Sequence, residues 1–102
     1  MGLNYKAIQQ MQNKMLKMQE ELHNSTFEGT SGGGAVAVAM NGKFEVTAIK
    51  LEKDVVDPED VGMLEDLVLT AIQDAFGKVS EAQAKMMTSL TGGMKLPPGL
   101  GF

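Results

Sequence analysis

The sequence contains no cysteine, no arginine and no tryptophan, and its only histidine is His23. Without cysteine the chain has no disulfide, no thiolate metal site and no thiol nucleophile. A single histidine leaves no histidine pair for a zinc site and no Ser-His-Asp triad. We therefore expect a protein that is not an enzyme and that holds neither a metal nor a cofactor.

Long apolar runs are also missing. No run approaches the roughly 20 residues that a membrane-spanning helix requires, and the first residues lack the apolar segment of a secretion signal. We expect a cytoplasmic chain with no membrane partner. Its 102 residues predict a single domain, 1–102. A domain of this size buries a modest share of its surface, so association with a second copy is expected.

The charge balance is acidic. Nine lysines face thirteen aspartates and glutamates, which gives a formal net charge of −4. This sign is opposite to the net positive charge that nucleic-acid-binding proteins usually carry. Any polyanion must therefore meet a local patch of lysines.

The first 24 residues predict an amphipathic helix. Its apolar side chains follow a 3, 4, 3, 4 spacing that is typical of a helix seated against another helix. An isolated helix of this length is only marginally stable in water. We therefore expect this line of apolar side chains, called the seam below, to be buried against the rest of the chain or against a second copy. The residues expected in a dimer interface or core are this seam and two positions of a later helix: Ile8, Met11, Met15, Met18, Leu22, Val79 and Met86.

Residues 25–53 change to an alternating pattern and predict a three-stranded antiparallel meander, with strands over 26–30, 35–40 and 43–52. Asn41-Gly42 favours a type I′ turn between the last two strands. In the third strand, Phe44 and Val46 have the opposite parity to Ile49 and Leu51. A bulge near Thr47-Ala48 would bring all four side chains inside.

A long helix is predicted over residues 57–91, because Asp57 can cap it, Pro58 suits the first helical position and an apolar stripe follows. Gly77 marks a point where this helix could bend. The remaining residues, 92–102, contain Pro97-Pro98 and predict an extended tail. The fold class is thus α+β, with a three-stranded sheet between an N-terminal helix and a long C-terminal helix.

Three other features each have a simpler explanation than chemistry. The glycine run Gly32-Gly33-Gly34 leads into a strand rather than a helix, so it reads as a flexible connection and not as a phosphate loop. Acidic residues between Asp54 and Asp66 lack the spacing of a calcium loop, and acid suits a helix start. His23 lies near the predicted C-terminus of the first helix, where a positively charged side chain interacts favourably with the helix dipole.

A face of the first helix carries Lys6, Gln10, Lys14 and Lys17, spaced 4, 4 and 3. Lysine side chains on one face of a helix could contact successive phosphates of a nucleic-acid backbone. The alternative is an ordinary solvated face, in which Glu20 and Glu21 pair with Lys17. Lys78 and Lys85 of the second helix would extend the patch if the two helix ends converge.

Four segments in this order resemble the YbaB/EbfC nucleoid-associated proteins of bacteria. They are Met11-Gln-x-Lys-Met-x-Lys-Met-Gln-Glu-Glu21, Val38-x-x-Asn41-Gly42, Met63-Leu-Glu-Asp-Leu67 and Gly93-Met-x-Leu-Pro-Pro-Gly99. The resemblance implies an αβββα protomer, a tweezer-shaped homodimer in the cytoplasm, and binding to DNA along the nucleoid with an influence on transcription.

The chain departs from that family where members carry paired arginines, since it has Thr47-Ala48 and Gly77-Lys78 at those places. Arginine supplies the bidentate fork that reads guanine. Without it, we expect weak, nonspecific or shape-dependent binding through lysine-phosphate contacts. The alternative function is a dimeric protein-interaction module that serves a replication or recombination protein without touching DNA.

Overall fold

The computed structural model describes residues 5–91, so the predicted tail of residues 92–102 and the first four residues lie outside it. The order of elements is the predicted one, and the fold is α+β. The elements are helix α1 (Tyr5–His23), strand β1 (Thr26–Ser31), a 3-10 turn (Gly32–Gly34), strands β2 (Val36–Asn41) and β3 (Val46–Leu51), a second 3-10 turn (Lys53–Val55), and helix α2 (Val61–Thr91).

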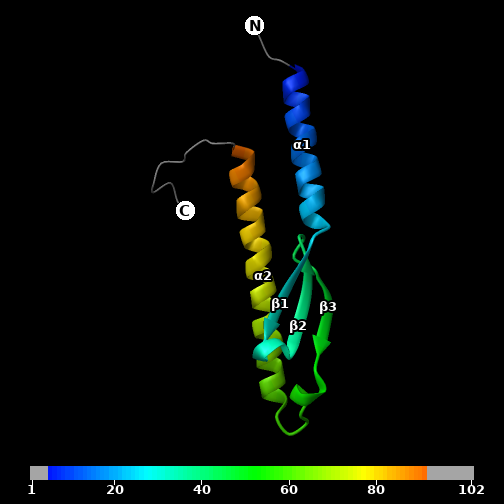
Figure 1. Ribbon diagram of the computed structural model, residues 1–102, viewed down its shortest axis with the longest axis vertical. Coiled ribbons are helices and arrows are strands. Elements are labelled where there is room, and N and C mark those ends of the chain that lie inside the picture. Colours follow the sequence, from blue (N-terminus) through cyan, green and yellow to red (C-terminus); the bar gives the residue numbers. More distant parts are fainter. Residues whose placement is uncertain (1–4, 92–102) are drawn as a thin grey trace, which may run out of the picture.

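The sheet is a meander of order β1-β2-β3 with antiparallel neighbours, and α2 lies along one face of it (Figure 1). Alternation along β2 turns Val36, Val38 and Met40 toward α2. On α2, a line of small residues spaced four positions apart faces the sheet. The buried core consists of Val36, Val38, Met40, Ala71, Ala75 and Val79.

The contact between β1 and α2 is unusually close at Gly29. A Cβ atom at this position would overlap the backbone of Ala71 and of Ala75. Only glycine on the strand and alanine on the helix leave enough room for the two backbones. This contact draws α2 toward β1 and β2, the two strands on which it packs.

The predicted bulge in β3 is confirmed. Ala39 pairs with Ala48 and Met40 pairs with Val46, so Thr47 has no partner in the register. The bulge places Val46, Ile49 and Leu51 on the inner face, but the expectation that they lie inside is wrong. They are 42%, 48% and 40% exposed, because α2 packs on β1 and β2.

The predicted type I′ turn at Asn41-Gly42 is also wrong. Gly42 does not have a positive φ, whereas Phe44 does, at 64°. The amide of Phe44 donates to the carbonyl of Asn41, and the Asn41 side chain accepts from the amides of Lys43 and Glu45. The turn is therefore one residue longer, and the Phe44 ring stacks on Phe76 with centroids 4.5 Å apart.

The long helix begins at Val61, later than the predicted start at residue 57. The carboxylate of Asp57 accepts from the amide of Glu59 in a separate turn, and the carboxylate of Asp60 accepts from the amide of Met63. Asp60 is thus the residue that caps α2. The helix then runs without interruption through Gly77.

Two glycine-to-alanine substitutions should have opposite effects on stability. Gly29→Ala forces β1 and α2 apart, and overpacking of this kind costs about 1 to 3 kcal/mol. Gly77→Ala meets no atom within 4 Å, and it should stabilise the helix by about 1 kcal/mol. Urea unfolding followed by circular dichroism measures both. Equal effects of the two substitutions would contradict the close contact at Gly29.

Candidate nucleic-acid interface

Helix α1 projects from the sheet for most of its length (Figure 1). None of its 19 residues is buried. Its half-buried residues are Met18, Gln19, Leu22 and His23, all in its last two turns. The helix is therefore attached to the rest of the described chain at its C-terminal end.

Three elements meet at this attachment. A Cβ atom at Gly42 would overlap the carbonyl of Leu22, so the hairpin turn lies directly against the end of α1. The side-chain amide of Gln83 on α2 donates to the carbonyl of Gly42 over 3.4 Å. Ser25, which follows the helix, donates its hydroxyl to the carbonyl of Glu21. These contacts fix the direction in which α1 leaves the sheet.

The predicted lysine face of α1 lies on this projecting helix. At about 100° per residue, Lys6, Gln10, Lys14 and Lys17 fall within an arc of about 80°. All four side chains are exposed. Among the described residues the ion pairs are those of Lys78 and Lys85, so the α1 lysines are not neutralised by a neighbouring carboxylate.

Lys78 on α2 is tied to the sheet instead. Its ammonium donates to the carbonyl of Glu28 over 2.6 Å and lies 3.8 Å from the carboxylate of Asp74. The same carboxylate accepts from the amide of Thr30 over 2.9 Å. Asp74 and Lys78 therefore occupy backbone groups of β1, which is an edge strand. The sequence carries no local signal for this tie, because Lys78 and Glu28 are 50 positions apart.

Lys85 lies two turns further along α2 and forms an exposed pair with Glu81 at 3.3 Å. An exposed pair of this kind is weak and is screened by salt. Lys85 therefore remains available to an anion, whereas Lys78 must first leave its carbonyl partner. The two α2 lysines differ in this way from the unpaired lysines of α1.

The apolar seam of α1 is only partly covered. Ile8, Met11 and Met15 are 38%, 62% and 39% exposed, while Met18 and Leu22 are half-buried near the attachment. Of the two α2 residues grouped with them, Val79 is fully buried in the core and Met86 is half-buried. The free end of the seam is thus available to a partner.

The glycine run and the acidic residues have structural roles. Gly32 to Gly34 all have positive φ and form the 3-10 turn that joins β1 to β2. Buried Ser31 beside them donates its hydroxyl to the carbonyl of Leu67. Within residues 5–91, no three acidic or histidine side chains are grouped as metal ligands would be.

Charge is distributed unevenly along the molecule. The segment from Glu52 to Asp66 contains seven acidic residues and one lysine. It includes the turn before α2, which lies at the end of the molecule opposite the projecting α1 (Figure 1). A polyanion is therefore repelled at one end and meets exposed lysines at the other.

Comparison with known proteins identifies close relatives. A family model described as the YbaB/EbfC DNA-binding family matches residues 1–94. A nucleoid-associated protein of Rhodopseudomonas palustris is 48% identical over 97 residues, which cover 95% of this chain and 92% of that protein. A nucleoid-associated protein of Chloroflexus aurantiacus is 53% identical over 87 residues, which cover 85% of this chain and 87% of that protein.

The fold also matches a solved structure. The crystal structure of an uncharacterized protein from Helicobacter pylori superposes with a TM-score of 0.74 at 19% identity. The match covers 89% of this chain and all of that chain. At this identity it establishes the fold alone. Separately, no helix within residues 5–91 has the length and apolar character needed to cross a membrane.

The tie between Lys78 and β1 predicts a difference between the two α2 lysines. Lys78→Met removes a hydrogen bond to a backbone carbonyl and should destabilise the fold by about 1 kcal/mol. Lys85→Met, the matched control, removes an exposed pair and should change stability by less than about 0.5 kcal/mol. Methionine is a helix former comparable to lysine. Thermal unfolding compares the variants, and equal stabilities would show that the Lys78 contact carries no energy.

Proposed function

The chain belongs to the YbaB/EbfC DNA-binding family, and on that basis we propose that it binds duplex DNA of the bacterial nucleoid as a homodimer, mainly through contacts between lysines and phosphates. Its curated relatives are named nucleoid-associated proteins, which supports a place on the nucleoid in the cytoplasm. A part in nucleoid organisation and in gene regulation belongs to the same proposal.

The observation that carries the proposal is the strip of Lys6, Gln10, Lys14 and Lys17 on the projecting helix α1. These residues are exposed, and the lysines have no carboxylate partner among the described residues. Binding then releases counterions from DNA without first breaking an ion pair in the protein. The glutamine amide can donate to phosphate oxygen in addition.

The chain has no arginine, so the guanine-reading fork is missing and lysine contributes point charges. Contacts of this kind position a protein on DNA but carry little sequence information. The acidic segment at the opposite end supports an approach with α1 foremost. We therefore propose weak binding with little sequence preference.

The homodimer is supported by the shape of the protomer. The described residues have a radius of gyration of 19.3 Å, against about 13 Å for a compact domain of ~100 residues. The exposed end of the α1 seam adds to the uncovered apolar surface. Two copies also double the number of lysines that one DNA duplex meets.

The second candidate is a protein-interaction module that serves a replication or recombination partner. The observation that favours it is the exposure of Met11 and Met15, because flexible methionines suit surfaces that bind partners of varied shape. The net charge of −4 is in keeping with it. Binding of the parent protein to duplex DNA at low salt separates the two candidates.

The DNA proposal is tested by fluorescence anisotropy on a duplex of arbitrary sequence over a salt series. Affinity should fall steeply with salt and change little with sequence. The triple variant Lys6→Gln, Lys14→Gln, Lys17→Gln should reduce the slope of log affinity against log salt by up to about 3 for each protomer engaged. Glutamine keeps the helix, since its helix propensity is close to that of lysine.

The matched control changes three other exposed lysines, in the variant Lys43→Gln, Lys50→Gln, Lys53→Gln. The net charge falls by the same amount, but the strip on α1 stays intact. The control should keep most of the salt slope. An equal loss in both variants would mean that only total charge matters, and no binding by the parent would favour the protein-interaction module.

A further inference from the structure

The apolar seam of α1 is longer than the part of α2 that lies beside it. Gln83 donates to the carbonyl of Gly42, and Gly42 lies against Leu22, so Gln83 and Leu22 are at about the same height where the helices meet. From Gln83, α2 rises to Thr91, about 12 Å further on. On α1, about 10 Å from Leu22 already reaches Met15. The two helices run in opposite directions, and α2 ends beside the middle of α1 (Figure 1).

The burial of the seam changes at the end of α2. Met18 and Leu22 lie between that end and the sheet, and they are half-buried. Met11 and Ile8 lie about 5 and 9 Å beyond the end, and they are 62% and 38% exposed. From Met15 outward, the seam thus continues for about two helical turns past the helix that covers it.

The chain itself supplies an apolar segment at this place. Residues 92–102 follow the last described residue of α2, and Lys95 is the one charged side chain among them. Pro97-Pro98 excludes a helical continuation, and Gly92-Gly93 allows the chain to turn where α2 ends. The apolar residues of this segment are Met94, Leu96, Pro97, Pro98, Leu100 and Phe102. Its composition suits an extended segment that packs on an apolar surface.

We propose that residues 92–102, called the tail below, cross from the end of α2 to α1 and pack along the exposed part of the seam in the same chain. The tail covers Met15, Met11 and Ile8. This inference goes beyond the proposed function and does not depend on it, because it concerns a contact within one chain.

The tail is long enough for this path. Eleven extended residues span up to about 36 Å. Packed helices have axes about 8 to 10 Å apart, and the far end of the exposed seam is about 9 Å beyond α2. Residues near Leu96 can therefore reach Met11 and Ile8. A tethered segment has a local concentration on the order of millimolar, which favours the tail over a separate partner.

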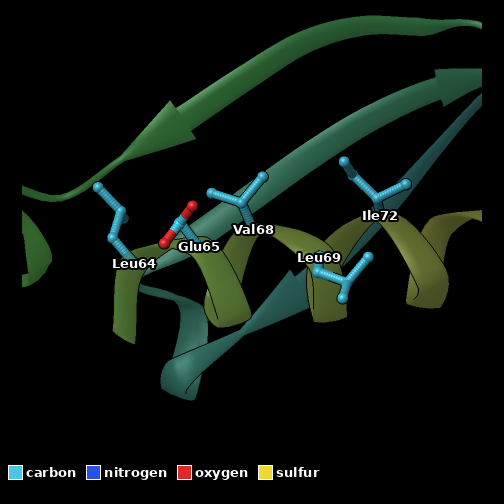
Figure 2. Close-up of a pocket in the computed structure, with 5 residues that line it drawn as sticks. All are labelled: Leu64, Glu65, Val68, Leu69 and Ile72. Atoms are coloured by element: carbon cyan, nitrogen blue, oxygen red, sulfur yellow. The ribbon is translucent and has the colours of Figure 1, made fainter. Parts of the chain in front are cut away.

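A second exposed apolar surface is less accessible to the tail. Its residues line a shallow pocket on α2, and Figure 2 shows Val68 and Ile72 rising on the side of the strands. The lining residues are Leu64, Glu65, Val68, Leu69 and Ile72. Ile72, the nearest of them, lies about 28 Å along α2 from Thr91. Most of the tail would be needed to reach this pocket, whereas the exposed seam begins beside Thr91.

A tail on the seam leaves the proposed DNA contacts free. At about 100° per residue, the centre of the exposed seam lies about 130° around α1 from the centre of the strip of Lys6, Gln10, Lys14 and Lys17. The tail would hold α1 beyond its last two turns and would fix the direction in which the strip points. It would also cover the methionines on which the protein-interaction candidate depends.

Oxidation by dilute hydrogen peroxide tests whether the seam is covered by the tail. Met11 and Met87 are 62% and 59% exposed without the tail, so an open seam predicts similar rates. Under the tail, the sulfoxide of Met11 should form at least about 3-fold more slowly than that of Met87. Leu96→Asp should make the rates equal. The matched control Gly99→Asp adds the same charge to the tail and should keep the difference, which peptide mass spectrometry measures.

Two outcomes of the oxidation experiment would overturn the inference. Equal rates for Met11 and Met87 in the parent protein would mean that the seam is open. A slow Met11 that Leu96→Asp does not accelerate would mean that a different segment or molecule covers the seam.

A disulfide tests whether the tail belongs to the same chain as the seam. The sequence has no cysteine, so Met11→Cys with Leu96→Cys introduces one pair of thiols. The matched control is Gln9→Cys with Leu96→Cys, since Gln9 is exposed and lies about 3 Å along α1 but about 160° around it. The seam pair should form a bridge within one chain at least about 10-fold faster than the control, because disulfide geometry is specific. Non-reducing electrophoresis separates this product from a linked dimer. Equal rates, or a linked dimer as the main product, would overturn the inference.

Discussion

The contact of Gly29 with Ala71 and Ala75 determines where α2 lies on the sheet. It brings α2 so close to β1 that the helix packs on β1 and β2, and the apolar side chains of β3 remain exposed. It also brings Asp74 and Lys78 within reach of the β1 backbone. One close backbone contact therefore decides which backbone groups of β1 are bound by side chains of α2 and which apolar side chains of β3 remain exposed.

Local patterns in the sequence predicted the elements well. The period of the apolar residues gave both helices and the three strands, and the parity of Ile49 and Leu51 gave the bulge at Thr47. The errors concern features that depend on distant contacts. Asn41-Gly42 does not form the predicted turn; in the longer turn that forms instead, Phe44 has a positive φ and its ring packs on Phe76 of α2. Val46, Ile49 and Leu51 are not inside because the position of α2 depends on Gly29, which no pattern in β3 records.

The candidate site was predictable to the extent that it is local. Spacing alone put Lys6, Gln10, Lys14 and Lys17 on one face of a helix, and the structure places all four on an exposed surface. Lys78 was grouped with them because its charge is visible in the sequence while its partner is not. The carbonyl of Glu28 and the carboxylate of Asp74 become its neighbours only after β1 and α2 meet.

The attachment of α1 by its last turns has a mechanical consequence. A helix of 19 residues is about 28 Å long, and α1 contacts the rest of the described chain only near its C-terminal end. A rotation of about 10° at its base would displace Lys6 by about 5 Å, while Lys17 near the base would move less than half as far. The outermost lysine of α1 thus has the longest reach, and the distance between Lys6 and the lysines of α2 depends on the angle at which α1 leaves the sheet.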